Sequence, residues 1–172
     1  MVHSRKHIIL LLGPKGSGKS FIGSLIQKHL GIPFLLVEKW LKDLRNNRDL
    51  DDKNYLEQVF NTIESGVRNE LAKNDTVAFE STGLTPYFDQ MLDRLQGDYN
   101  VTCVKVIADI EVCLERIGQR DASLHIPVTE EEILEINQQH ATKNFNYHFE
   151  IVNEGKSEAE LVDVLRELPF MR

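Results

Sequence analysis

The segment IILLLGPKGSGKS, residues 8–20, joins an apolar run to a loop rich in glycine. The apolar residues from Ile8 to Leu12 are typical of a buried strand. Side chains spaced three and four residues apart follow the loop and predict one face of a helix. This face contains Phe21, Ile22, Leu25, Ile26, His29 and Leu30. The segment therefore predicts a strand, a loop and a helix in this order.

The loop, Gly13 to Ser20, fits the pattern G-x-x-x-x-G-K-[ST], which binds the phosphates of nucleoside triphosphates. Glycines let successive backbone N–H groups turn toward an anion, and the start of the following helix adds further N–H donors. We expect Lys19 to reach the β- and γ-phosphates and the Ser20 hydroxyl to bind Mg²⁺. The residues expected to contact the nucleotide are Gly13, Pro14, Lys15, Gly16, Ser17, Gly18, Lys19, Ser20 and Phe21.

Length and composition are typical of one soluble domain, which we place at residues 1–172. The chain is 41% hydrophobic and 27% charged, with a net charge of −7 and a pI near 5.4. An acidic chain has no general attraction to nucleic acid or to an anionic membrane, so neither is an expected partner. No apolar stretch approaches the roughly 20 residues that span a bilayer. We expect a cytoplasmic protein that is a monomer or a weak homodimer.

Strands and helices alternate along the rest of the chain. Continuous apolar runs predict buried strands at residues 34–37, 76–79, 101–108 and 149–152. Amphipathic patterns and capping residues predict helices at residues 54–73, 85–95, 109–120, 129–143 and 157–168. The charged segment 39–53 is expected to be an exposed loop or a short helix beside a substrate cleft. The fold class is therefore α/β, with a five-stranded parallel sheet covered by helices on both faces.

Polar residues follow several of these strands, at the edge where parallel sheets bind their ligands. Glu38 is expected after the second strand, Glu80 after the third, and Asn153 after the fifth. A carboxylate at this edge can orient the water around Mg²⁺ or accept a proton from an acceptor hydroxyl. We expect Glu38 and Glu80 to divide these catalytic roles, and we count Glu80 among the candidate metal ligands. Ordinary carboxylates at strand ends are the alternative interpretation.

Three segments resemble the small P-loop kinases, most closely the shikimate kinase-like and adenylate kinase-like group. GPKGSGKSFIGSLIQKHLGIPFLL is similar to the opening of that group, and VKVIADIEVCLERIGQR to its fourth strand and the helix that leads to its lid. IVNEGKSEAELVDVL is similar to the loop over the adenine and the last helix. The resemblance implies a three-layer P-loop NTPase fold that uses ATP and Mg²⁺ to phosphorylate a small acceptor.

The resemblance also implies roles for three further residues. Arg116 precedes a lid at residues 120–129 and Arg120 begins it; both would neutralise phosphate charge, with Arg116 against the adenine. A solvated helix face is the alternative for both arginines. Asn153 lies in the segment similar to the adenine loop, where it would contact the nucleotide, and a simple turn residue is its alternative.

The acceptor side departs from the shikimate kinases. Their D-x-D after the second strand corresponds to Leu36 and Glu38, and their three glycines after the third strand correspond to residues 81–83, of sequence STG. Asn61 stands where an arginine would hold the carboxylate of shikimate. We therefore expect the phosphoryl-transfer residues of that group, with a different acceptor bound beside residues 38–73.

The sequence leaves the following interpretations open. A nucleoside or nucleotide kinase is one alternative to a kinase of another small metabolite, and an ATP-binding regulatory module with slow ATPase activity is a second. His125 and His140 are candidates to touch substrate, although isolated histidines usually have no such role. Trp40 and Phe88 are expected near the cleft, where packing is the simpler role for both.

Overall fold

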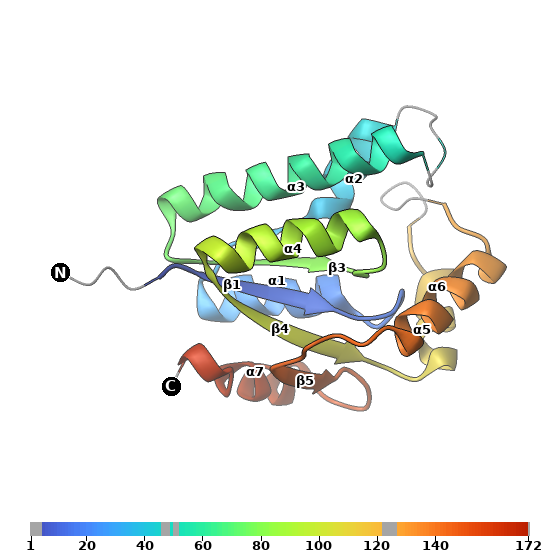
Figure 1. Cartoon of the computed structure of the whole chain (residues 1–172). Coiled ribbons are helices and arrows are strands. Elements are labelled where there is room, and N and C mark those ends of the chain that lie inside the picture. The colour runs from blue at the N-terminus through green and yellow to red at the C-terminus, as the bar shows by residue number, and fades with distance from the viewer. Residues whose placement is uncertain (1–4, 46–48, 50–51, 122–126, 172) are drawn as a thin grey trace.

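The computed structural model describes residues 5–45, 49, 52–121 and 127–171. These residues form one five-stranded sheet in the order β2-β3-β1-β4-β5, in which all paired strands are parallel (Figure 1). The strands are β1 (His7–Leu12), β2 (Phe34–Leu35), β3 (Thr76–Ser81), β4 (Asn100–Ile107) and β5 (Phe149–Val152). The predicted α/β fold with a five-stranded parallel sheet is confirmed.

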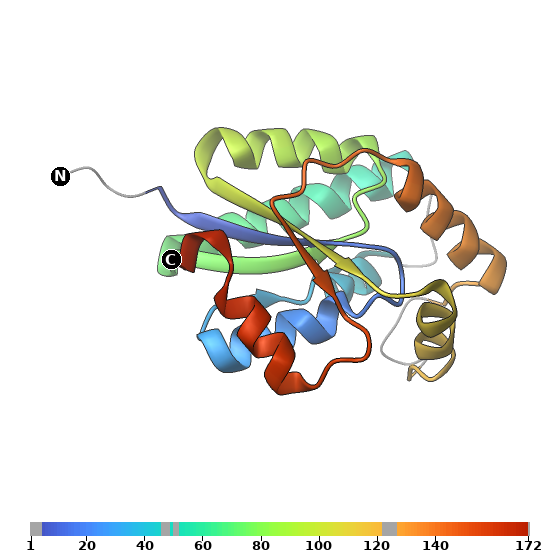
Figure 2. The same cartoon turned by 90° about the horizontal axis from the view of Figure 1, so that it is seen from below.

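Helices cover both faces of the sheet. The described helices are α1 (Lys19–Leu30), α2 (Val37–Arg45), α3 (Lys53–Lys73), α4 (Pro86–Asp98), α5 (Ile110–Gly118), α6 (Glu130–Thr142) and α7 (Glu158–Arg166). Figure 2 shows α3 and α4 on one side of the sheet and α1 and α7 on the other. Helices α5 and α6 lie beyond the carboxyl ends of the strands, at the edge where the phosphate loop leaves β1 (Figure 1).

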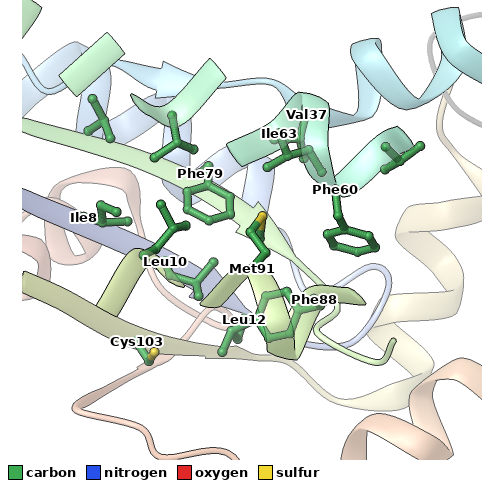
Figure 3. Close-up of a cluster of buried hydrophobic side chains, with 14 of the residues drawn as sticks. Ile8, Leu10, Leu12, Val37, Phe60, Ile63, Phe79, Phe88, Met91 and Cys103 are labelled. Carbon is green, nitrogen blue, oxygen red and sulfur yellow. The ribbon is translucent and has the colours of Figure 1, made fainter. Parts of the chain in front are cut away.

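Alternate side chains of β1 belong to two separate cores, because successive residues of a strand point to opposite faces. Ile8, Leu10 and Leu12 pack with residues of α3 and α4, including Phe60 and Phe88 (Figure 3). The intervening residues Ile9 and Leu11 pack against α1 and α7. All β1 residues from 8 to 12 are fully buried. Burial on both faces explains why β1 is continuously apolar. It also fixes the end of β1 from which the phosphate loop begins.

The three side-chain helix caps that the sequence predicts are all present. The Asp109 carboxylate accepts a hydrogen bond from the backbone N–H of Glu111 at the start of α5. Thr129 and Ser157 form reciprocal capping boxes with Glu132 and Glu160 at the starts of α6 and α7. Such caps satisfy N–H groups that have no partner inside the helix.

The predicted strand at residues 34–37 is wrong at its end. Strand β2 contains only Phe34 and Leu35, and α2 begins at Val37. Leu36 lies between them with 56% of its surface exposed. The side chains of α2 that pack against the core are Val37, Trp40, Leu41 and Leu44. Their helical spacing lets the segment bury one face against α3, which favours the helix over a longer strand.

Other boundaries also differ from the prediction. Strand β3 continues to Ser81, so Glu80 lies inside this strand, where it pairs with Leu11 of β1, and not after its end as predicted. Helix α4 includes Gly97, and α5 ends at Gly118, so Arg120 lies just beyond the helix. On α1, Phe21 is 45% exposed and His29 is exposed, so both lie outside the buried face on which the sequence placed them.

None of the described helices combines the length and the apolar character needed to cross a membrane.

Candidate active site

The phosphate loop connects β1 to α1, and two of its glycines have conformations that other residues rarely adopt. Gly16 and Gly18 have φ of 84° and 88°, and Gly18 is the N-cap of α1. A Cβ atom on Gly16 would collide with the backbone of Cys113 in α5, and one on Gly18 would collide with the Asn153 amide. The glycines therefore permit both the turn and the close packing of the loop against its neighbours.

Lys19, the lysine of the loop pattern, is 8% exposed and folds back over the loop. Its ammonium donates hydrogen bonds of 2.9 Å to the carbonyl oxygens of Gly13 and Pro14. Burial lowers the pKa of Lys19 to about 8, while the Glu80 carboxylate opposes the change. The structure thus holds a desolvated cation at the start of α1, where an anion would strengthen its charged form.

Ser20 and Glu80 meet beside Lys19. The Ser20 hydroxyl donates a hydrogen bond of 2.7 Å to Glu80 Oε1, and Glu80 is 8% exposed. Both are oxygen donors of the kind that Mg²⁺ prefers, and Mg²⁺ commonly takes one or two protein oxygens together with water and phosphate. Among the described residues, no group of three or more His, Cys, Asp or Glu side chains gathers to hold a metal. The pair therefore fits Mg²⁺ bound together with a nucleotide.

Arg116 of α5 and Asn153, which directly follows β5, hold the loop. The Asn153 amide donates a hydrogen bond of 2.8 Å to the Ser17 carbonyl, and only 5% of Asn153 is exposed. Arg116 donates to the Asn153 carbonyl at 2.8 Å and to the Ser17 carbonyl at 3.4 Å. Asn153 is therefore a buried support of the loop, which a simple turn residue would not be.

Asn137 of α6 holds the loop at a second point, and sequence reasoning missed it. Its Oδ1 accepts a hydrogen bond of 2.8 Å from the Lys15 N–H, and its Nδ2 donates one of 3.2 Å to the Lys15 carbonyl. Asn137 is buried on the same face of α6 as Ile133 and His140. A polar residue at that helical spacing was the available signal, because buried polar groups normally have a hydrogen-bonding partner.

A cavity of about 280 Å³ opens on the loop and brings seven of the predicted site residues together. These are Lys15, Gly16, Lys19, Ser20, Glu38, Glu80 and Arg120. We call this space the main cavity. Its remaining lining comes from the end of β3, α2, α3, α6 and the segment before α6: Val37, Leu41, Phe60, Ile63, Ser81, Thr82, Val128 and Ile136. Figure 3 shows Val37, Phe60 and Ile63 close together in this part of the molecule.

A second cavity, of about 310 Å³, lies at four other predicted nucleotide contacts, Gly18, Phe21, Arg116 and Asn153. It is lined by Gly18, Phe21, Arg116, Asn153, Glu154, Gly155 and Lys156, and we call it the outer cavity. The exposed Phe21 thus lines the outer cavity, whereas Lys19, Ser20 and Ile22 beside it on α1 do not. Arg116 and Arg120, which share an R-x-x-x-R spacing, line different cavities.

Four other candidates lie outside the main cavity. Trp40 packs against Gly66, where an added Cβ would collide with its ring, and Phe88 is fully buried in the core. His140 is 5% exposed and stacks on Phe145, with ring centroids 5.0 Å apart. Asn61 lines two surface depressions on α3 rather than the main cavity, which Phe60 and Ile63 reach instead. His125 and part of the predicted lid fall outside the described residues.

Comparison with known proteins agrees with the fold. The sequence profile described as AAA domain matches residues 8–142, which is more than half of the chain. No curated protein sequence gives a significant match.

Several solved structures share the architecture over nearly the whole chain. Shikimate kinase from Aquifex aeolicus is 20% identical, with a TM-score of 0.60 and coverage of 92% of this chain and 93% of that one. A gluconokinase from Sinorhizobium meliloti is 19% identical, with a TM-score of 0.58 and coverage of 94% and 90%. A sugar kinase from Janibacter is 11% identical, with a TM-score of 0.64 and coverage of 96% and 95%.

These likenesses establish the fold, and they confirm the resemblance to the shikimate kinase-like group that the sequence indicates. The family is established by the profile match, which begins at the buried strand before the phosphate loop and ends at the last residue of α6. The chain therefore belongs to the AAA domain family and has the fold of the small P-loop kinases.

Proposed function

We propose that the chain is an ATP-dependent kinase that transfers the γ-phosphoryl group to a small acceptor molecule. One observation carries this proposal: the main cavity is lined by both the phosphate-loop residues Lys19 and Ser20 and the more distant residues Glu38, Glu80 and Arg120. Phosphoryl transfer requires positioning and the neutralisation of spreading negative charge. Cations and carboxylates around one small cavity supply the groups for both.

The nucleotide is proposed to extend from the main cavity to the outer cavity. Lys19 would bind the β- and γ-phosphates, and Arg116, Asn153 and Phe21 would contact the nucleoside part in the outer cavity. Ser20 and Glu80 would hold Mg²⁺, which would neutralise charge on the phosphates when bound. The 2.7 Å hydrogen bond between these two side chains supports placing Glu80, rather than Glu38, on the metal side.

In the proposed reaction, an acceptor hydroxyl attacks the γ-phosphorus atom. The bond between that phosphorus and the β,γ-bridging oxygen breaks, and ADP leaves with the electron pair. The new bond joins phosphorus to the acceptor oxygen, whose proton passes to Glu38. Lys19 and Arg120 would neutralise charge on the phosphoryl oxygens during transfer. A lid at residues 120–129 and a substrate-side segment at residues 38–73 belong to this proposal.

The lining of the main cavity supports an acceptor with a partly apolar body. Val37 and Leu41 of α2, Phe60 and Ile63 of α3, and Ile136 of α6 provide apolar surface. Asn61, which corresponds to the arginine expected for shikimate, does not line this cavity. The pocket therefore favours a small alcohol over the polar, carboxylated shikimate as acceptor.

Acceptor-dependent turnover tests the proposal. ADP release from Mg-ATP would be measured with a panel containing shikimate, gluconate, nucleosides, nucleoside monophosphates and less polar alcohols, with Lys19→Ala as the control. Stimulation by one acceptor, lost in the control, is the expected result. Stimulation only by nucleosides or nucleoside monophosphates would make it a nucleoside or nucleotide kinase. Tight ATP binding with slow turnover that no acceptor changes would contradict the proposal and favour a regulatory module.

A further inference from the structure

The phosphate loop contains a second lysine, Lys15, whose backbone is fixed by one buried side chain. The Asn137 amide pairs with both polar backbone groups of Lys15, accepting from its N–H at 2.8 Å and donating to its carbonyl at 3.2 Å. Asn137 is 7% exposed, so water does not compete for these bonds. Two hydrogen bonds to one residue restrict rotation of its backbone and so restrict the direction of its side chain. The Lys15 N–H, engaged by Asn137, is also not available to a phosphate.

The side chain of Lys15 lines the main cavity together with Lys19 and Arg120. Lys19 gives its hydrogen bonds to loop carbonyls, whereas the Lys15 ammonium makes no hydrogen bond or ion pair within the described part of the chain. An ammonium group that loses water without gaining a partner is unfavourable. Burial accordingly lowers the pKa of Lys15, against the opposing effect of the Glu38 carboxylate. The cavity therefore presents a cation that an anionic ligand would stabilise.

Lys15 shares the main cavity with both proposed sides of the reaction, the acceptor base Glu38 and the metal-side carboxylate Glu80. Both carboxylates act to raise the pKa of Lys15, against the effect of burial. Negative charge develops between these two sides when a phosphoryl group passes from ATP to an acceptor.

We infer that Lys15 is a second catalytic cation of the phosphate loop, which contacts the phosphoryl group during its transfer, and that Asn137 is its positioning residue. The inference rests on the proposed kinase function and uses the same transfer: the bond to ADP breaks, the bond to the acceptor oxygen forms, and Glu38 takes the proton. The Lys15 ammonium remains protonated and donates to an oxygen of the moving phosphoryl group. Asn137 acts only through the loop backbone.

The test uses the full chain and a mimic of the transferred group. Calorimetry would measure the Kd for Mg-ADP alone and for Mg-ADP with aluminium fluoride, which imitates the phosphoryl group in transfer. Lys15→Met should reduce the gain in affinity from aluminium fluoride by about 10²-fold, the effect of losing one donor to a transition state, and should leave the Kd for Mg-ADP nearly unchanged. Lys15→Arg should restore part of the gain, because it keeps the positive charge.

Asn137→Leu should lose much of the same gain, and the Lys15→Met/Asn137→Leu double variant should be no worse than Lys15→Met alone. Asn137→Asp serves the same comparison if the leucine variant does not fold. Matched controls are Lys28→Met on the exposed side of α1 and Gln138→Ala next to Asn137, both of which should behave as the wild type.

Two results would overturn the inference. One is a Lys15→Met variant with the wild-type gain from aluminium fluoride; a raised KM for the acceptor in that variant would assign Lys15 to an anionic group of the acceptor instead. The other is an equal loss of affinity for Mg-ADP with and without aluminium fluoride, which would mean ground-state binding only. Failure of the proposed function looks different, because the wild type itself would then show neither acceptor-dependent turnover nor a gain from aluminium fluoride.

Discussion

The Ser20 hydroxyl donates a hydrogen bond of 2.7 Å to Glu80 Oε1, joining the first turn of α1 to β3 across 60 positions of sequence. The sheet enforces this contact. Strand β3 pairs with β1 so that Glu80 lies beside Leu11, two residues before the phosphate loop begins at Gly13. Backbone pairing of β3 with β1 therefore holds the Glu80 carboxylate next to the phosphate loop.

Glu80→Gln is predicted to weaken the use of Mg²⁺. The amide keeps the size of the side chain but removes the charge that would hold or orient the metal, so the Mg²⁺ concentration for half-maximal turnover should rise about 10- to 100-fold. A magnesium titration of ADP release measures it. Glu111→Gln, an exposed carboxylate of α5, is the control. An unchanged magnesium requirement in Glu80→Gln would remove Glu80 from the metal side.

Arg116 and Arg120 are predicted to affect different kinetic constants, because they line different cavities. Arg116→Ala should weaken ATP binding by roughly 10-fold or more, since it loses hydrogen bonds that position the Ser17 and Asn153 carbonyls. Arg120→Ala should instead lower kcat by about 10²-fold with a smaller effect on ATP binding, as expected for a charge that acts mainly in the transition state.

Steady-state kinetics and ATP titration would separate these two effects. Arg166→Ala, on the exposed surface of α7, is the control for loss of an arginine. Equal losses of kcat and of ATP affinity in both variants would show that Arg116 and Arg120 do not have the separate roles proposed, in ATP binding and in the transition state.

The parts of this fold that were predictable from sequence have local causes. The phosphate loop, the buried strand β1 and the caps at Asp109, Thr129 and Ser157 depend on residues close together in the chain, and the structure contains all of them. Glu80 was expected at the ligand edge because parallel strands end there, and only its position relative to the end of β3 was wrong.

The parts that were missed depend on tertiary contacts. Whether residue 37 continues a strand or begins a helix is decided by packing of α2 against α3. Asn137 contacts Lys15 across 122 positions, so no local pattern reveals the partner. Asn61 corresponds in sequence to an arginine of the shikimate kinases that would bind substrate. In the structure, Phe60 and Ile63 are the residues of this part of α3 that line the main cavity, and Asn61 is not among them.

Two helical glycines give opposite predictions for the same substitution. Gly66→Ala should destabilise the protein by about 1–3 kcal/mol, because the new Cβ would overlap the Trp40 ring, which packs between α2 and α3. Gly97→Ala should stabilise it by about 0.5 kcal/mol or slightly more, because a Cβ there meets no atom within 4 Å and alanine favours the helix.

Urea unfolding measures both changes. Trp40 is the only tryptophan in the chain, so its emission reports the local displacement directly. Gly66→Ala should change that emission in the folded state and Gly97→Ala should not. Equal stabilisation by both variants would show that Trp40 does not press against Gly66.

His140 should make the protein sensitive to acid. Burial, followed by the charge of Lys19, lowers the pKa of His140 to about 4, whereas an unfolded histidine titrates near 6.5. Between these values the unfolded chain binds more protons than the folded one, so the free energy of unfolding falls as pH falls from about 6.5 to about 4. Above that range His140 adds no pH dependence to the free energy of unfolding. The contribution is on the order of 1–3 kcal/mol at the acidic end.

His140→Leu removes the titrating group and keeps an apolar contact to Phe145, on which His140 stacks. Urea unfolding of both proteins at a series of pH values would give the difference in stability between them. That difference should be constant near neutral pH and should shift in favour of His140→Leu as the solution becomes acidic. His29→Leu, at an exposed histidine of α1, is the control for the loss of a histidine. A difference between wild type and His140→Leu that stays constant down to about pH 4 would mean that His140 is protonated in the folded protein as readily as in the unfolded chain.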